Sequence, residues 1–331
     1  MNRFVTGLAL ATLMGAGASA AQAPASSSVD ELVSRAKAAA GVDWTGTFSR
    51  LCIPPPPAGA RAGGARAGGP AAGPPARATW YAEPAKVADN LYFLGTKAHH
   101  SWALVGSDGI IVFEALFEYA SADQIEEGFR KLGLDGSKVK FIVLSHAHGD
   151  HDGGARFIQD IFKNARMVYG APDWDAVEKS TNRPGGKPRR DLDGTDGMKM
   201  TIGDTSVQIV TMPGHTAGTL SYLFEIKDRG RPLKVAYVGG TAIPFDGDAA
   251  YYDQYISSTQ KMARAAADFG ATVLLSNHTE FDNGYYKAHT AANRKGADVS
   301  NPFDMGAAGV ARYFSVVENC TAAAKLRSGK R

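Results

Sequence analysis

The chain has 331 residues, of which 44% are hydrophobic, so it can bury the core of one large domain or two small ones. Of its 36 basic residues, one lies in residues 1–23 (Arg3) and three lie in the Pro- and Gly-rich residues 54–78 (Arg61, Arg66 and Arg77). Without these four, 32 basic residues stand against 33 acidic ones. A net charge of −1 excludes a basic excess that would attract nucleic acid, and no run beyond the leader approaches the roughly 20 apolar residues of a membrane-spanning helix.

Residues 1–23 have the composition of a secretory signal peptide. Arg3 provides a positive start, Phe4–Met14 is a short apolar stretch, and the triplets ASA and AQA at residues 18–23 are small-x-small cleavage sites. The apolar stretch is too short to span a membrane. We therefore expect a soluble protein that is exported to the periplasm or secreted.

Two further segments precede the main body. Within the N-terminal arm, residues 24–53, a capping box that begins at Ser28 opens an Ala-rich helix that is expected to end at Gly41. Residues 54–78 are rich in Pro, Gly and Ala and lack hydrophobic periodicity, which predicts a solvated linker. The main domain is then expected over residues 79–331.

The chain contains two cysteines, Cys52 and Cys320. Neither has a metal-ligating neighbour in the sequence, so a zinc-thiolate site is a weak interpretation. In an exported protein the two could form a disulfide that ties the N-terminal arm to the C-terminal end. Two free buried thiols are the alternative that the sequence leaves open.

After the linker, the pattern predicts strands that come first in hairpins and then alternate with helices. Strands are expected at residues 91–96, 101–106, 109–114, 139–145, 167–170, 207–211, 220–226, 233–238 and 272–276. Helices are expected from Ser121, with a second capping box to Gln124, and at residues 154–163, 172–180, 255–269 and 285–295. No repeat of solenoid length is visible, and this order indicates a mixed α/β body.

The hexapeptide HAHGDH directly follows the apolar strand that ends near residue 145. In extended backbone His146 and His148 point to the same side, and the glycine after them allows a tight turn that brings Asp150 and His151 to a neighbouring point. Imidazole nitrogen and carboxylate oxygen are good donors to zinc. These four side chains cannot close around a single ion, so the pattern predicts two half-sites.

Further histidines follow other predicted strands. His215 lies in PGHTAG and His278 in SNHT, each just after an apolar strand. Five of the eight histidines therefore lie at strand ends, which favours a metal site over a set of structural histidines. Of the other three, His99 and His100 could edge the pocket but are expected to pack or to face water, and His289, on a polar helix, is expected to be solvated.

The combination of HAHGDH, PGHTAG and a last histidine after a strand resembles the metallo-β-lactamase superfamily over roughly residues 85–300. The resemblance implies an α/β fold, a four-layer αββα sandwich with two Zn²⁺ ions at the edge of its sheets. It implies that one zinc is held by His146, His148 and His215. It implies that the second is held by Asp150, His151 and His278.

One position narrows the resemblance. Many hydrolases of the superfamily carry a metal-bridging aspartate where this chain has Gly240, and its absence together with an Asp-His-His second site resembles the third subclass of metallo-β-lactamases. Where that subclass usually has serines, this chain has Gly240 and Ala242, for which Thr241 could partly compensate. Glu114 also replaces the usual aspartate at the end of the third strand. These departures weaken the expectation that β-lactams are the substrates, but they do not change the expected fold and metal sites.

The resemblance implies a hydrolase in which a water bridging the two zincs becomes hydroxide near neutral pH, oriented by Asp150 as the catalytic residue. Thr241 and Asn277 are candidate substrate contacts. The basic loop at residues 181–190 is another candidate, with an ordinary solvated turn as its alternative. Because the second site has one histidine fewer and no bridging carboxylate, we expect it to bind zinc more weakly than the first, and we expect Gly240→Asp to tighten it.

Three functions remain open on the sequence. The first is an exported β-lactamase-like enzyme that opens a cyclic amide, and the second is a metallo-hydrolase of another ester, lactone or amide with weak or no β-lactamase activity. The third is a metal-binding protein without catalysis, against which the complete ligand set argues. The expected partner is a small-molecule substrate, with neither nucleic acid nor a membrane involved.

Overall fold

The computed structural model describes residue 1 and residues 27–55, 73–296 and 298–329. The predicted signal peptide beyond Met1 and residues 56–72 of the predicted linker lie outside this part of the chain. None of the helices among the described residues is both long enough and apolar enough to cross a membrane.

Two β-sheets form the centre of the molecule. The first has seven strands in sequence order: β1 (Ala85–Lys86), β2 (Leu91–Phe93), β3 (Trp102–Gly106), β4 (Gly109–Phe113), β5 (Val139–Val143), β6 (Arg166–Gly170) and β7 (Leu192–Gly194). The second has five strands in the order β12-β11-β10-β9-β8: β8 (Lys199–Ile202), β9 (Thr205–Thr211), β10 (Leu220–Asp228), β11 (Arg231–Val238) and β12 (Val273–Ser276). Pairs β4–β5, β5–β6, β6–β7 and β11–β12 are parallel, and the other neighbours are antiparallel.

The strands are buried on both faces of the first sheet, as β4 shows. Ile111 and Phe113 point into the core between the two sheets, where Phe113 stacks on Phe224 of β10 with ring centroids 5.2 Å apart. Ile110 and Val112 point the other way, into a core shared with the outer helices. Because side chains alternate along a strand, a fully apolar strand requires such a covered sheet.

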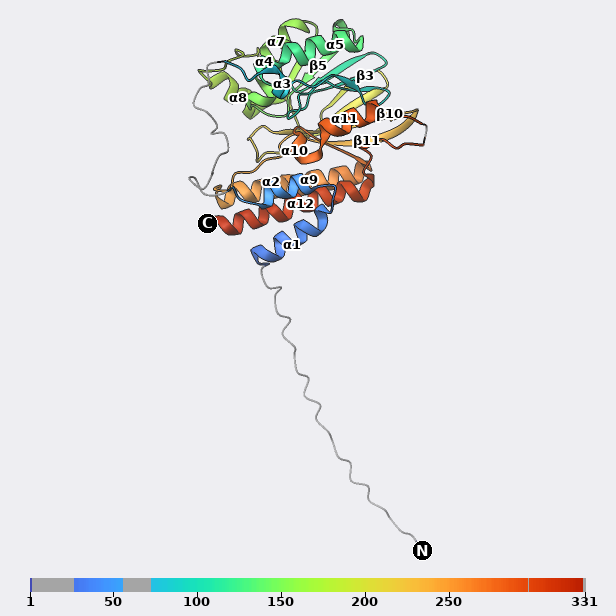
Figure 1. Cartoon of the computed structure of the whole chain (residues 1–331). Helices are drawn as coiled ribbons and strands as arrows, with labels where there is room; N and C mark the ends of the chain where they lie inside the picture. The colour runs from blue at the N-terminus through green and yellow to red at the C-terminus, as the bar shows by residue number, and fades with distance from the viewer. Residues whose placement is uncertain (2–26, 56–72, 297, 330–331) are drawn as a thin grey trace.

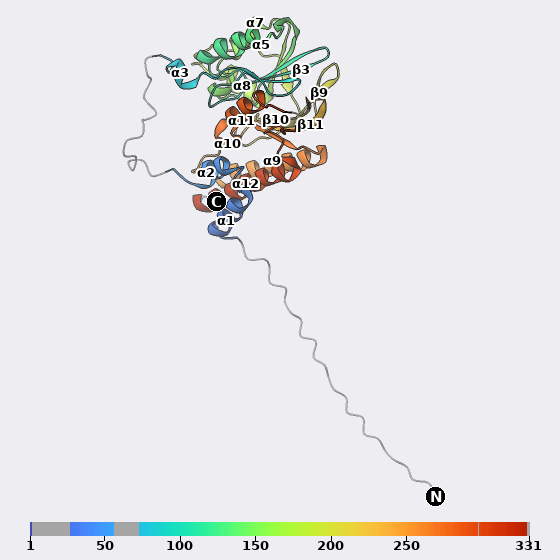
Figure 2. The ribbon, with the colours of Figure 1, turned by 45° about the vertical axis from the view of Figure 1, so that its right-hand side comes forward.

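Helices cover the outer face of each sheet, which confirms the expected four-layer αββα sandwich (Figures 1 and 2). The first sheet is covered by α4 (Glu118–Ser121), α5 (Glu127–Leu132), α7 (Ala155–Ile161) and α8 (Ala171–Lys179). The second is covered by α9 (Ala249–Phe269) and α12 (Gly306–Ser328), with α1 (Val29–Ala40) and α2 (Thr45–Cys52) beside them. The remaining short helices are α3 (Arg77–Trp80), α6 (Gly149–Asp152), α10 (Thr279–Asp282) and α11 (Gly284–Ala292), with a π-helical turn η1 (Ala122–Glu126) and a 3₁₀ turn η2 (Gly136–Lys138).

The N-terminal arm is packed against the C-terminal helix. The capping box at Ser28 and the helix end at Gly41 are confirmed, and α1 and α2 both contact α12. The indole nitrogen of Trp44 donates a hydrogen bond to the carbonyl of Gly309, at 2.9 Å. A disulfide joins Cys52 and Cys320, with Cα atoms 4.6 Å apart, so the predicted pairing is confirmed and the free-thiol alternative is wrong.

Some predicted boundaries differ from the structure. Ser121 does not begin a helix: α4 has already begun at Glu118, and the Ser121 hydroxyl donates to the carbonyl of Ala115, at 2.6 Å. The segment predicted as linker ends earlier than expected, because α3 begins at Arg77. The strands β7 and β8 and the helix α12 were not predicted, although β8 alternates exposed and buried residues and α12 buries Val310, Tyr313, Phe314 and Val317 at helical spacing.

Candidate metal centre

Three loops carry the candidate ligands to one place. His146 and His148 follow β5, and Asp150 and His151 lie on the single turn of α6 that comes next. His215 lies between β9 and β10, and His278 immediately precedes α10 after β12. The loops are held together by backbone contacts, such as the hydrogen bond from the amide of Leu220 to the carbonyl of Ser145, at 2.8 Å.

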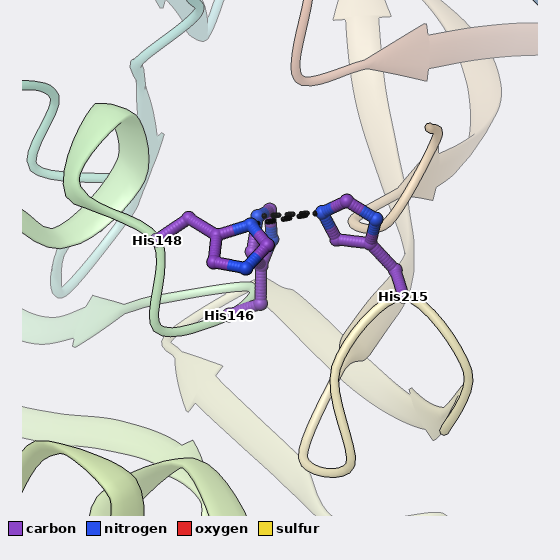
Figure 3. Close-up of side chains that lie close together, drawn as sticks. All are labelled: His146, His148 and His215. Atoms are coloured by element: carbon purple, nitrogen blue, oxygen red, sulfur yellow. Dashed lines mark hydrogen bonds between the residues drawn. The ribbon is translucent and has the colours of Figure 1, made fainter. Parts of the chain in front are cut away.

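His146, His148 and His215 form the first cluster (Figure 3). Nε2 of His215 lies 3.2 Å from Nε2 of His146 and 3.1 Å from Nδ1 of His148. The other ring nitrogens point away: Nδ1 of His146 donates to the carbonyl of Gly239, at 2.8 Å, and Nδ1 of His215 donates to the carbonyl of Ala242, at 2.7 Å. A carbonyl can only accept, so Nδ1 carries the proton of each ring and Nε2 carries a lone pair.

The charge state of these rings suits a metal ion. Burial, reinforced by the neighbouring imidazoles, holds the pKa of His146 well below its ordinary value and lowers the pKa of His215 to about 4. Both rings are therefore neutral near pH 7, and two lone pairs face one another at 3.2 Å without a proton between them. A cation between them would remove that repulsion, and ligand nitrogens around tetrahedral zinc are roughly 3.3 Å apart. The residues present fit such an ion.

Asp150, His151 and His278 form a second, adjacent cluster. Nε2 of His151 lies 3.0 Å from Nε2 of His278 and 3.2 Å from Oδ2 of Asp150, and the His278 and Asp150 atoms are 3.6 Å apart. The ring of His151 also lies 4.4 Å from the ring of His146, measured between centroids, so the two clusters are neighbours. Burial alone would raise the pKa of Asp150, but the hydrogen bond from His151 and the surrounding imidazoles lower it well below its ordinary value. The structure thus brings together all six side chains that the resemblance implied.

His99 lies in the second cluster as well, which was not expected. Its Nε2 is 3.5 Å from Oδ2 of Asp150, and the ligand atoms of His99, Asp150 and His278 all lie within 4.8 Å of one another. His100 does pack as expected: it is fully buried, and its Nδ1 donates to the carbonyl of Ser276, at 2.7 Å. His289 is half-buried against Tyr285 rather than solvated. In the sequence, only the position of the histidine pair just before a strand hinted at His99.

Asp173, on α8, holds the two ligand loops together. Its Oδ2 accepts from the backbone amide of Ala147 and from the hydroxyl of Thr216, both at 2.8 Å, and its Oδ1 accepts from the amide of Gly218, at 2.8 Å. Ala147 lies between the first two histidines, while Thr216 follows His215. This buried carboxylate is a positioning residue that the sequence pattern did not reveal, because it lies in the first turn of a predicted helix, where an acidic residue is common.

Glu114 approaches His151 from the end of β4. Its Oε2 is 3.7 Å from Nδ1 of His151, and the same carboxylate accepts hydrogen bonds from the amide of Ser145 and the hydroxyl of Tyr237. Burial raises the pKa of Glu114 to about 7, an effect that His151 and these hydrogen bonds partly offset. The glutamate therefore lies behind the second cluster, where it acts on His151 through its charge, since Nδ1 of His151 makes no hydrogen bond at this distance.

Thr241 and Asn277 lie beneath the clusters. They are 1% and 0% exposed, and the Thr241 hydroxyl donates to Oδ1 of Asn277, at 3.1 Å. The Asn277 amide donates to the carbonyl of Gly239, at 2.6 Å, which is also the acceptor for His146. Their burial favours support of His146 over the predicted contact with substrate.

Gly240 lies against His215. A Cβ atom at Gly240 would lie 2.7 Å from Cβ of His215 and 2.8 Å from Cγ2 of Thr219, which is closer than real Cβ atoms come. A carboxylate there would displace a candidate ligand. The expectation that Gly240→Asp tightens zinc binding stays a prediction, and these close contacts count against it.

The basic side chains of the loop at residues 181–190 form ion pairs and hydrogen bonds within the protein. Arg183 pairs with buried Asp152, and Arg190 pairs with Asp175 at 2.7 Å. The other two cations are also engaged, Lys187 with the carbonyl of Glu178 and Arg189 with Asp160. The alternative of an ordinary structural turn fits these contacts.

Two hollows flank the clusters. One, of about 550 Å³, is lined by Phe117, Tyr119, Gly149, Arg183 and Pro184 among others, including the end of the linker at Gly73 to Pro75. The other, of about 420 Å³, is lined by Lys97, His99, His278 and Tyr286 among others. Candidate ligands line only the second of these two hollows, which therefore offers a substrate direct access to the second cluster.

Comparisons with known proteins agree with this arrangement. Residues 94–231 match the family model described as the metallo-beta-lactamase superfamily. The chain is similar to a hydroxyacylglutathione hydrolase of Shewanella baltica, with 33% identity over 129 residues, which is 38% of this chain and 44% of that protein. It is similar to the N-acyl homoserine lactonase AttM of Rhizobium johnstonii, with 35% identity over 44% of this chain and 60% of that protein. The matched part is thus less than half the length of the first of these relatives.

Solved structures share the fold over a longer range. BJP-1, a subclass B3 metallo-beta-lactamase of Bradyrhizobium japonicum, is 25% identical with a TM-score of 0.59 and covers 71% of this chain and 90% of its own. The FEZ-1 metallo-beta-lactamase from Legionella gormanii is 21% identical with a TM-score of 0.63 and covers 75% of this chain and 97% of its own. The likeness to these two structures therefore covers 71% and 75% of the chain.

Proposed function

Because the chain belongs to the metallo-β-lactamase superfamily of metallo-hydrolases, we propose that it is a zinc-dependent hydrolase that opens a cyclic amide in the manner of a β-lactamase. The observation that carries the proposal is the pair of adjacent clusters, one of three histidines and one built on Asp150, His151 and His278. The loop after β11 contributes no bridging carboxylate to them, because Gly240 stands there against His215.

The residues of the chain prepare the site for hydrolysis. When bound, two zinc ions would supply an acidic water molecule and would polarise the carbonyl group of the substrate. His146 and His215 are held as neutral donors by the carbonyls that accept from their Nδ1 atoms. Asp150, whose pKa the neighbouring imidazoles keep low in spite of burial, remains ionised and can accept a hydrogen bond from the attacking water. Its carboxylate thereby orients the nucleophile.

The second candidate is hydrolysis of a lactone or of another ester or amide. Two observations favour it: the curated relatives are a hydroxyacylglutathione hydrolase and a lactonase, and the chain lacks exposed side chains at Gly240 to Ala242 that could hold a β-lactam carboxylate. Thr241, the polar residue there, is buried against Asn277. Substrate choice therefore depends on the hollows at Phe117 and at His99.

A substrate panel decides between the candidates. The full chain, loaded with zinc, is assayed with nitrocefin, a carbapenem, N-acyl homoserine lactones and an acylglutathione thioester. We expect turnover of the β-lactams that is lost in His148→Ala. Turnover of a lactone or thioester with inert β-lactams would replace the first candidate by the second. Inactivity towards every class in the zinc-loaded protein would contradict both.

We also propose that the protein acts outside the cytoplasm. The composition of residues 1–23 and the disulfide between Cys52 and Cys320 support export, since disulfides persist in oxidising compartments. Mass spectrometry of protein from the periplasm should show a new N-terminus between Ala20 and Pro24. Active protein that retains Met1 would contradict this proposal.

A further inference from the structure

The side chain of His99 enters the second cluster from a separate part of the fold. His99 lies in the loop between β2 and β3 and forms an isolated antiparallel bridge with His278. Its Nε2 is 3.5 Å from Oδ2 of Asp150, a separation within the range of the other contacts in this cluster, 3.0 to 3.6 Å. Three imidazoles, those of His99, His151 and His278, therefore lie around the same carboxylate oxygen of Asp150.

The loop holds His99 firmly in this position. The Thr96 hydroxyl accepts from the backbone amide of His99, at 2.8 Å, and the amide of Thr96 donates to the carbonyl of His99, at 2.7 Å. Gly95 is required beneath it, since a Cβ there would lie 2.6 Å from the same carbonyl oxygen. The imidazole packs edge-on against the rings of Phe117 and His278, each with centroids 5.1 Å away. A ring fixed on several sides can serve as a ligand at little cost in conformational entropy.

We propose that His99 is a fourth protein ligand of the second metal ion, together with Asp150, His151 and His278. This inference rests on the proposed zinc-dependent function. A zinc ion with four protein ligands is closed, whereas an ion with three keeps a position for water or substrate. The open position therefore belongs to the ion held by His146, His148 and His215. The second ion is bound tightly, contrary to the weak second site that the sequence suggested.

A hydrogen-bond donor to Asp150 is the competing role for His99. At 3.5 Å from Oδ2, a protonated Nε2 could support the carboxylate without touching metal. A glutamine side chain can donate such a hydrogen bond but is a poor ligand for zinc. The variant His99→Gln therefore separates the two roles.

The test measures metal binding by the full chain. Metal-free wild type and the variants His99→Ala, His99→Gln and His289→Ala are titrated with zinc by calorimetry and with Co²⁺ by visible absorption. His289 is a matched control, since it is a half-buried histidine on α11 outside the clusters. We expect two ions in each protein. In both His99 variants one binding step should weaken at least tenfold and the cobalt bands should change, while the other step and the control match wild type.

Rescue of His99→Ala by free imidazole provides a second test, because imidazole would not restore metal binding if His99 had only a structural role. His99 lines an open hollow of about 420 Å³, so free imidazole can reach the space left by His99→Ala. We expect added imidazole to restore the weakened step and the wild-type cobalt spectrum. Equal unfolding midpoints of the metal-free proteins would show that the variants are folded.

The outcomes separate this inference from the proposed function. Wild-type affinities and spectra in His99→Gln would overturn the inference and assign His99 a hydrogen-bonding role. A wild type that binds fewer than two ions would overturn both the inference and the two-zinc function. Two ions, a weakened step in the His99 variants and no hydrolysis of any substrate would support the inference and contradict the function alone.

Discussion

Asp173 accepts a hydrogen bond from the hydroxyl of Thr216, at 2.8 Å, and so fixes the loop that carries His215. The same carboxylate accepts from the amide of Ala147, between the first two histidines of the cluster. The geometry of the first cluster thus depends on a residue of α8 that contacts none of its three imidazoles. A carboxylate suits this place because it offers acceptors only, and each of its neighbours donates.

The variant Asp173→Asn should therefore loosen the first metal site and destabilise the fold. The amide nitrogen must face a backbone donor at either Ala147 or Gly218, which leaves one buried N–H group without an acceptor, at a cost of about 2 kcal/mol. Zinc affinity at the first site should fall roughly 10- to 100-fold. Urea unfolding and calorimetric zinc titration measure the two effects. Asp175→Asn, an exposed position on the same helix, is the control, and equal effects from both variants would contradict the assignment.

His148 offers a way to remove a ligand without damaging the core. It is exposed, whereas His146 is buried, so His148→Ala removes little packing and should change the stability of the metal-free protein by less than about 0.5 kcal/mol. Hydrolysis should fall roughly 100-fold or more, because the first site loses one of three ligands. Steady-state kinetics and thermal unfolding of the metal-free variant provide the measurements. Full activity in His148→Ala would rule out the assigned site.

The site could be predicted from the sequence because most of its candidate ligands lie close together in the chain or directly after a predicted strand. HAHGDH places four candidates within six residues, and His215 and His278 each follow an apolar strand. The fold was predictable for the same reason, since strands such as β4 and β5 are short apolar runs that need cover on both faces.

The parts that were missed depend on contacts between distant segments. His99 becomes a candidate ligand only because its loop pairs with His278. Asp173 becomes a positioning residue only because α8 brings it into hydrogen-bonding contact with two ligand loops. Neither partner can be read from neighbouring residues. At Ser121 the local signal was misleading: an S-x-x-Q pattern lies inside a helix that had already begun, and the serine hydroxyl bonds backward to Ala115.

The disulfide should be a large contribution to stability. It closes a separation of 268 residues between Cys52 and Cys320, for which the chain-entropy model gives an upper value of ~5 kcal/mol. Replacing both cysteines by serine should lower the free energy of unfolding, and α1 and α2 should exchange amide hydrogens faster, since they are tied to α12 by this bond. Denatured, unreduced wild type should show no titratable thiol. Two titrating thiols would contradict the pairing.

Acid should destabilise the metal-free protein through its buried histidines. Burial lowers the pKa of His99 and of His215 to about 4, whereas in the unfolded chain both groups have pKa values near 6.5. The unfolded state therefore binds more protons as the pH falls from about 6.5 to 4, and folding loses stability across that window. The raised pKa of Glu114, about 7, acts in the opposite direction and offsets part of the loss.

A difference measurement isolates one histidine. His215→Gln removes one titrating imidazole while keeping a polar side chain in its place, so the variant should lose less stability on acidification than wild type. The slopes of unfolding free energy against pH should differ by at most ~1.4 kcal/mol per pH unit between pH 6.5 and 4. Urea unfolding of the metal-free proteins at several pH values measures both slopes. Parallel slopes would mean that His215 is protonated in the folded state, and that its Nε2 is not the free donor which a metal ion requires.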